Sequence, residues 1–225
     1  MRIDILTLFP EMFDGFLETS IIKRARDNGY VDIRVHNFRD YSLDKHKRVD
    51  DYPYGGGAGM VLMCEPIFRA IDDLKTDDSL VIMMSPSGSV FKQNIAKNLS
   101  KKHHLIILCG HYEGFDERIR TIVDMEISIG DYVLTGGEVP SMVVTDAITR
   151  LIPGVITKES LDSESFNDGL LDYPNYTRPE EFRGMRVPDV LLSGHHKNIE
   201  NYRKEAQIKK TNDVRSDLNG GKSNG

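Results

Sequence analysis

Glycine-bearing loops are the segments of this 225-residue sequence with the clearest potential for chemistry. Three of them come directly after short apolar runs: SPSG at 85–88, GHYEG at 110–114 and IGDYVLTGGE at 129–138. Glycine lets backbone amides and carbonyls approach a ligand because no Cβ intervenes. One such loop is more often a tight turn, but three at successive strand ends favour a shared nucleotide-like ligand at the carboxyl edge of a parallel sheet.

The densest glycine cluster is the segment DDYPYGGGAGM at 50–60. It lacks the Lys-Ser/Thr ending of a P-loop and the GxGxxG spacing of a dinucleotide site. A flexible bend flanked by aromatic and basic residues could accept a flat base, which makes Tyr54, Gly55, Gly56 and Gly57 candidate substrate contacts. A purely structural turn is the alternative.

Composition and residue spacing limit which partners and which cellular compartment are expected for the chain. No histidine lies in an HExxH or a Cys/His ligand spacing, so no metal ligands are predicted. Cys64 and Cys109 each sit beside apolar residues, which predicts reduced thiols in a cytoplasmic protein. The apolar runs are too short to cross a bilayer, so no membrane partner is expected. The net charge of −6 argues mildly against nucleic acid, but short basic runs interrupt the acidic chain and leave the partner open.

Strands and amphipathic helices alternate through the first two thirds of the chain. This pattern predicts an α/β domain with a mainly parallel sheet. Pro10 suits a first helical position. Strands are expected at 2–9, 31–35, 80–84, 105–109 and 127–129, and helices at 11–28, 91–99, 115–123 and 139–151.

The alternating pattern of strands and helices ends after Pro153-Gly154. Residues 157–168 are polar with little periodicity, as in a linker or a mobile loop. A helical segment follows with Ile199, Tyr202 and Ala206 on one face, which predicts a small, mainly helical second domain.

Long ordered motifs connect these segments to a known family. GHYEGFDERI, SIGDYVLTGGE, ITRLIPGV, SFNDGLLDYPNYTRPEEF and VPDVLLSGHH occur in this order, after IDILTLFPEMFDG and DDYPYGGGAGM. The chain resembles the bacterial tRNA (guanine-N1)-methyltransferase family from Met1 to about Lys210. Only the C-terminal tail is short and divergent for that family.

The resemblance implies a fold that the alternation of strands and helices alone does not predict. Sequence reasoning predicts an open doubly wound sheet, because knots are essentially absent from ordinary folds. The family belongs to the knotted (SPOUT) methyltransferases, whose parallel-sheet domain ends in a deep trefoil knot. The implied layout is a knotted domain at 1–156, a flexible linker or lid at 157–171, a helical tRNA-binding domain at 172–215 and a disordered tail at 216–225.

The resemblance also implies S-adenosylmethionine as methyl donor, held in a bent form by the three strand-end loops. A magnesium requirement stays open. The family is homodimeric, with each site built from both subunits. The residues implied to bind the cofactor are Met84, Pro86, Gly110, Glu113, Ile129, Gly130, Asp131, Tyr132, Val133, Leu134, Gly136 and Gly137.

Methylation of guanine N1 makes its own chemical demands. N1 carries a proton at neutral pH, and removing that proton pushes negative charge onto O6, so a base and a fixed cation are needed. Arg150 matches the family's catalytic arginine and suits O6; its alternative role is a cation at a helix end. The family's base is an Asp before Ser-Phe, where this sequence has Glu164. Glu164 is therefore the expected base, with Asp162 as the second candidate.

The implied substrate is the guanosine directly 3′ of the anticodon, position 37, in tRNAs with a preceding guanosine. The C-terminal helices, including Arg203, would hold the anticodon arm. Another tRNA or rRNA guanosine is the nearest alternative. A nucleotide-binding oxidoreductase or hydrolase would need a phosphate fingerprint or a metal set, and a non-catalytic RNA-binding module would fail to bind the cofactor.

Overall fold

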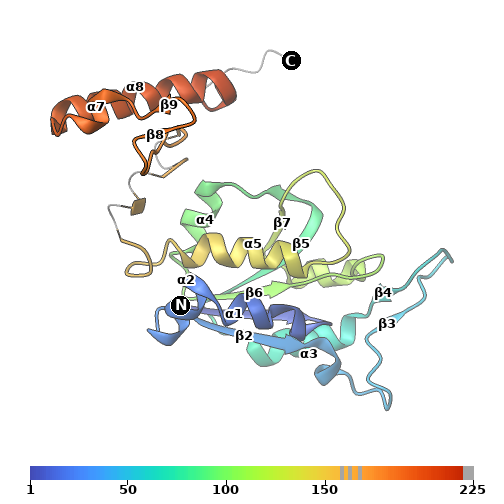
Figure 1. The fold of residues 1–225 in the computed structure, drawn as a ribbon. Coiled ribbons are helices and arrows are strands. Elements are labelled where there is room, and N and C mark those ends of the chain that lie inside the picture. The colour runs from blue at the N-terminus through green and yellow to red at the C-terminus, as the bar shows by residue number, and fades with distance from the viewer. Residues whose placement is uncertain (158–159, 162–163, 167–168, 220–225) are drawn as a thin grey trace. The chain divides into compact units, whose positions relative to one another are not determined.

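The computed structural model describes residues 1–157, 160–161, 164–166 and 169–219 of the chain. It divides into two compact units, Met1–Ile156 and Thr157–Gly225. Each unit is described by itself (Figure 1).

The first unit is built on a five-stranded sheet in the order β2-β1-β6-β5-β7 (Figure 1). Every neighbouring pair in this sheet is parallel, which confirms the predicted α/β domain. The strands are β1 (Arg2–Thr7), β2 (Asp32–Asn37), β5 (Ser79–Val90), β6 (His104–Leu108) and β7 (Met125–Ser128). A separate two-stranded antiparallel pair joins β3 (Asp50–Asp51) to β4 (Val61–Leu62).

Helices cover both faces of the sheet, and the central strands have mostly apolar buried residues because successive side chains point to opposite, covered faces. On β1, Ile3 and Ile5 belong to one core cluster and Leu6 to the other. The first cluster packs against α2 (Ser20–Asp27), α4 (Gln93–Leu99) and α5 (Glu138–Thr149). The second packs against α3 (Cys64–Leu74) and the 3-10 helix η3 (Glu117–Ile122).

Several elements differ from the sequence-based expectation. The helix predicted over 11–28 is three pieces: η1 (Pro10–Phe13), α1 (Asp14–Leu17) and α2. Thr19 adopts an extended backbone between the last two and donates its hydroxyl hydrogen bond back to the Gly15 carbonyl. The helix predicted over 115–123 is the shorter η3, whose cap Asp116 accepts from the Arg118 amide. Helix α3 was not predicted.

Strand β5 is irregular where the SPSG segment was expected to follow it. It pairs with β7 on both sides of a register shift between Met84 and Ser89. SPSG therefore lies inside β5 as a bulge. A Cβ on Gly88 would come within 2.5 Å of the Ile127 backbone nitrogen, so only glycine allows this approach.

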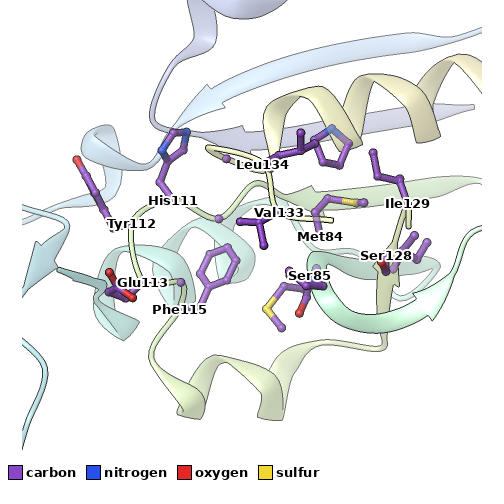
Figure 2. A pocket seen from close by; sticks show the side chains of 18 of the residues that line it. Met84, Ser85, His111, Tyr112, Glu113, Phe115, Ser128, Ile129, Val133 and Leu134 are labelled. Carbon is purple, nitrogen blue, oxygen red and sulfur yellow. The ribbon is translucent and has the colours of Figure 1, made fainter. Parts of the chain in front are cut away.

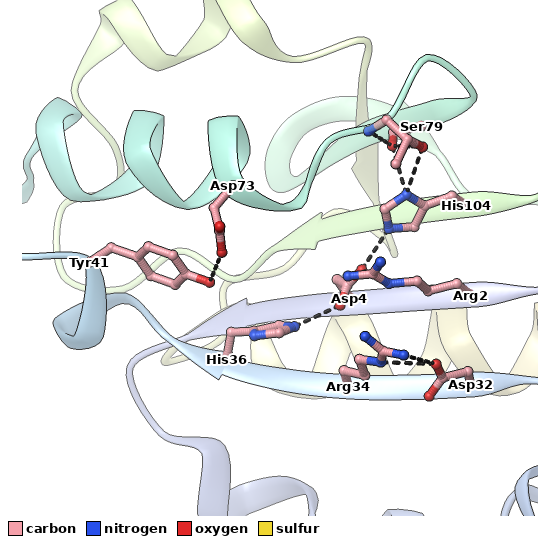
Figure 3. A network of polar contacts seen from close by, with 10 residues as sticks. Arg2, Asp4, Asp32, Arg34, His36, Tyr41, Asp73, Ser79 and His104 are labelled. Atoms are coloured by element: carbon pink, nitrogen blue, oxygen red, sulfur yellow. Dashed lines mark hydrogen bonds and ion pairs between the residues drawn. The ribbon is translucent and has the colours of Figure 1, made fainter.

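A buried carboxylate gathers three basic side chains on the α3 face of the sheet (Figure 3). Asp4 is fully buried, and its oxygens lie 2.6 Å from His36 Nε2, His104 Nε2 and Arg2 Nε. His104 Nδ1 lies 2.7 Å from Ser79 Oγ. This Ser-His-Asp order does not make a nucleophile, because the Ser79 hydroxyl accepts from a backbone amide and sits at the amino ends of the strands. The network is structural.

The second unit contains the hairpin β8 (Glu181–Phe182) and β9 (Met185–Arg186), then α7 (Asp189–Leu192), α8 (His196–Val214) and η4 (Ser216–Asn219). The long helix α8 agrees with the predicted helical character of this part; the hairpin was not predicted. Among the described residues, no helix is long and apolar enough to cross a membrane. Nor does the described part of the chain bring three or more His, Cys, Asp or Glu side chains together as a metal site.

Candidate active site

A pocket of about 370 Å³ opens at the carboxyl ends of the three neighbouring strands β6, β5 and β7 (Figure 2). Its walls come from the β5 bulge, the loop after β6 and the loop between β7 and α5. The sheet order makes these three loops adjacent although they are far apart in sequence. The structure thus brings the three predicted glycine-bearing segments together around one cavity.

Eleven of the twelve expected cofactor residues line this pocket. Asp131 is the exception, and it does not belong to the lining. Figure 2 shows Met84, Glu113, Ile129, Val133 and Leu134 around the cavity. Their binding roles stay predictions at this point, but their convergence follows from the fold.

Two wall loops pass within backbone contact of each other. The Gly137 amide donates to the Gly110 carbonyl at 2.8 Å, and Gly136 forms a β-bridge with His111. A Cβ on Gly137 would lie 2.6 Å from the Cys109 Cα, so any larger residue would push the loops apart. Glycine at positions 136 and 137 allows the two chain segments to approach this closely.

The turn after β7 is held by its own hydrogen bonds. Gly130 has φ +147°, and its amide donates to Ser128 Oγ at 3.2 Å. The Tyr132 amide donates to the Gly130 carbonyl at 3.0 Å, which folds the Tyr132 ring back over Gly130. A Cβ at Gly130 would lie 2.5 Å from that ring. The positive φ disfavours a side chain there, and a Cβ would also displace the Tyr132 ring.

Neither cysteine of the first unit is poised as a nucleophile. Burial and the neighbouring Asp116 carboxylate raise the pKa of the Cys64 thiol to about 11. Cys109 is completely buried behind the pocket, and burial raises the pKa of its thiol far above the usual range. Hydrogen bonds from Arg118 keep the pKa of Asp116 well below its usual range. A covalent thiol intermediate is therefore disfavoured here.

Arg150, the expected catalytic residue of the first unit, does not line this pocket. Arg150 is the C-cap residue of α5, whose other end begins at the pocket wall. Twelve helical residues at about 1.5 Å each put these ends roughly 18 Å apart. Glu164 belongs to the second unit, and its amide donates to the Leu161 carbonyl at 3.3 Å. Asp162 lies outside the described residues.

The expected substrate contacts fall in two places. Tyr54, Gly55, Gly56 and Gly57 form the tip between β3 and β4, where Tyr54 is fully exposed and the three glycines have positive φ. Arg203 lies on α8 of the second unit, where its guanidinium stacks over the Tyr173 ring at 4.8 Å.

Sequence reasoning missed two polar residues at the pocket wall. His111 lines the pocket, and its Nε2 lies 2.8 Å from a carboxylate oxygen of Glu138, which is 1% exposed. Only the position of Glu138 directly after the Gly-Gly pair at a helix start could have indicated it. Its partner His111 lies in the loop after another strand, so the spacing of residues along the sequence cannot identify the pair.

A parallel α/β sheet with converging glycine loops at the carboxyl ends of neighbouring strands defines a nucleotide-type ligand-binding enzyme domain. Comparison with known proteins narrows this class. A family model described as tRNA (Guanine-1)-methyltransferase TrmD matches residues 1–220. The chain belongs to this family, and it is accordingly an enzyme of the methyltransferase class that acts in tRNA modification.

Individual relatives agree over nearly the full length. A protein of Dictyoglomus turgidum named tRNA (guanine-N(1)-)-methyltransferase is 58% identical over 219 residues, covering 97% of this chain and 89% of the relative. A protein of the same name from Halalkalibacterium halodurans is 59% identical over 223 residues, covering 97% and 91%. One from Staphylococcus haemolyticus is 59% identical over 221 residues, covering 97% and 90%.

Proposed function

We propose that this enzyme transfers the methyl group of S-adenosylmethionine to N1 of guanosine 37, directly 3′ of the anticodon, in tRNAs with a preceding guanosine. The observation that carries the proposal is the convergence of three glycine loops on one pocket in a member of this family. We place the activity in the cytoplasm, where its tRNA substrate is found. Methylation of another tRNA or rRNA guanosine is the second candidate.

The pocket suits the proposed cofactor. Its volume of about 370 Å³ falls in the usual range for small-ligand pockets. Gly110 and Gly130 have no side chain, so their backbone amides are open to a nucleoside. The apolar side chains of Met84, Ile129 and Leu134 offer it a flat apolar wall. When bound, S-adenosylmethionine supplies an electrophilic methyl group on a sulfonium. We assign Glu113 to the methionine end.

We infer that the wall loops belong to a deep trefoil knot, as the family resemblance implies. The backbone contact between Gly137 and Gly110 supports this, because it brings the loop before α5 directly against the loop after β6. The knot would hold the bent cofactor without a mobile clamp.

Two residues carry the chemistry on the guanine base. Glu164 takes the N1 proton, and Arg150 stabilises the negative charge that this removal places on O6. A guanidinium suits O6 because it stays charged and donates in a fork. Asp162 remains the second candidate for the base.

We propose that the enzyme works as a homodimer with shared sites. The position of Arg150 supports this, because it caps the end of α5 roughly 18 Å from that helix's pocket end. An arginine there can serve the pocket of a second copy while its own pocket receives the partner subunit's arginine. Symmetric dimers are the commonest arrangement that provides such reciprocal contacts.

The second unit is proposed to bind the anticodon arm. Arg203, which is stacked on an aromatic ring, and the basic residues Lys204, Lys209 and Lys210 of α8 suit phosphates and unstacked bases. The segment 157–171 is proposed as a lid that carries the base over the substrate. The glycine tip with Tyr54 is proposed as a second substrate contact, since the exposed ring can stack on a base.

The direct test is methyl transfer onto unmodified tRNA transcripts, with the methylated base mapped. Transcripts with guanosine at 36 and 37 should be methylated at N1 of position 37, and transcripts with adenosine at 36 should be poor substrates. A methyl group at another guanosine would support the second candidate. Failure of the protein to bind S-adenosylmethionine in calorimetry would favour a non-catalytic RNA-binding module. Assays with and without Mg²⁺ decide the metal requirement.

A further inference from the structure

A buried carboxylate stands directly behind the pocket wall. Glu138 is the first residue of α5 and is 1% exposed. Burying a carboxylate is costly unless its oxygens are hydrogen-bonded. Thr7 Oγ1 donates to Glu138 Oε1 at 2.5 Å, and His111 Nε2 lies 2.8 Å from Glu138 Oε2. The helix N-terminus favours negative charge at the same point.

His111 is the member of this group that reaches the pocket (Figure 2). The bond between His111 Nε2 and Glu138 Oε2, at 2.8 Å, fixes the orientation of the ring. The ring then packs edge-on against Phe9, with centroids 4.7 Å apart, and against Tyr112 at 5.9 Å.

The loop 110–114 that carries His111 joins two walls of the pocket. On one side it meets Gly136 and Gly137 through a β-bridge and a backbone hydrogen bond. On the other side the Glu113 amide donates to the Met60 carbonyl at 3.0 Å, at the end of the glycine-rich segment. The pair of His111 and Glu138 is the side-chain bond that ties this loop to α5.

We propose that Glu138 is a positioning residue for cofactor binding: through His111, it holds the loop 110–114 against Gly136 and Gly137. The proposal rests on the proposed function of this pocket as the S-adenosylmethionine site. Glu138 itself does not touch the ligand. Its effect passes through the His111 ring to the loop that carries Glu113.

Four substitutions separate positioning from general stability, with S-adenosylhomocysteine binding measured by calorimetry and thermal unfolding measured in parallel. His111→Phe keeps a ring against Phe9 but loses the bond to Glu138, and should raise Kd by at least about tenfold. Thr7→Val removes the other bond to the same carboxylate, and should lower the melting temperature while changing Kd less than about twofold. Glu138→Gln keeps an acceptor for His111 and should recover most of the affinity lost in Glu138→Ala.

A double-mutant cycle completes the test. His111→Phe combined with Glu138→Ala should bind no more weakly than the weaker single variant, because both remove one interaction. Additive losses would overturn the proposal, as would equal weakening by Thr7→Val and His111→Phe. If Glu138→Ala does not fold, the comparison of Thr7→Val with His111→Phe decides alone.

A substitution within the pocket tests the cofactor site separately from the positioning role of Glu138. Gly130→Val should abolish binding whether or not Glu138 acts as proposed. Normal affinity in folded Gly130→Val protein would overturn the cofactor pocket itself. Loss of binding in Gly130→Val together with wild-type affinity in His111→Phe would overturn only the positioning role.

Discussion

At the scale of single residues, the proposed chemistry is divided between groups that act on the base and groups that hold the methyl donor. In the proposed mechanism Arg150 and Glu164 act on guanine, and Arg150 does not line the pocket. Their loss should therefore affect turnover and not cofactor affinity. Gly130 belongs to the opposite group, because it shapes the pocket and cannot touch the guanine proton.

Glu164→Gln should reduce kcat by on the order of a hundred- to ten-thousand-fold, because N1 loses its proton acceptor. Raising the pH should partly rescue this variant, since more guanine is then already deprotonated at N1. Single-turnover methylation between pH 7 and 9 measures both effects. Glu164→Asp should stay active, because it restores the residue type found in the family. A wild-type rate for Glu164→Gln with an inactive Asp162→Asn would reassign the base.

Arg150→Ala should be slowed by a similar factor, since a charge-stabilising donor contributes a few kcal/mol to the barrier. No pH rescue is expected, because the missing group neutralises O6 and does not accept a proton. Calorimetry should give nearly unchanged cofactor affinity. Rescue of Arg150→Ala at high pH would contradict the role at O6.

The glycine loops were predictable from the sequence because glycine has a direct steric meaning wherever chains or ligands approach closely. The Glu138 and His111 pair was not, since it joins residues from two loops that meet only in the folded sheet. The bulge that places SPSG inside β5 was equally hidden, because the pairing partner β7 determines it. Spacing along a chain does not encode such long-range partners.

At the scale of elements, the turn after β7 is a part of the pocket that is sensitive to substitution. Gly130→Val combines a disfavoured φ with a contact at 2.5 Å to the Tyr132 ring, and should abolish cofactor binding. Gly15→Ala is the matched control, because no heavy atom lies within 4 Å of its new Cβ. Calorimetry on both folded proteins measures the difference, and equal affinities would remove this turn from the cofactor site.

The sheet itself is stabilised by Asp4. Burial raises the pKa of this carboxyl, but hydrogen bonds from His36, Arg2 and His104 outweigh it and lower the pKa from 3.8 to about 2. A depressed pKa contributes stability that is complete above the unfolded value and is lost as pH falls through 3.8 towards 2. The contribution is about 2 kcal/mol at neutral pH.

Asp4→Asn should therefore lower the free energy of unfolding near pH 6 by about 2 kcal/mol or more, and less at pH 3. Urea unfolding at several pH values measures this. Asp32→Asn is the control, because its partner Arg34 is half-exposed and the pair contributes little. A gap between wild type and Asp4→Asn that widens on acidification would contradict the assigned role.

At the scale of the whole molecule, the proposed homodimer joins parts that lie at opposite ends of α5. The pocket lies at the start of this helix and Arg150 caps its end, so the proposed site takes its arginine from a second copy of the chain. Alternation of strands and helices was enough to predict the sheet, because apolar runs buried on both faces have few other solutions. The composite site stays a prediction that rests on the family resemblance, since an interface leaves no periodic pattern in the sequence.

Subunit mixing tests the shared site most directly. Gly130→Val and Arg150→Ala proteins, each inactive alone, are mixed in equal amounts, allowed to exchange, and assayed for tRNA methylation. Each heterodimer then has one intact pocket facing one intact arginine from the partner, so activity should recover to about a quarter of wild type. If Arg150 serves the pocket of its own chain, both sites of every heterodimer stay defective. No recovery after exchange, verified by mass spectrometry of the dimers, would contradict the shared site.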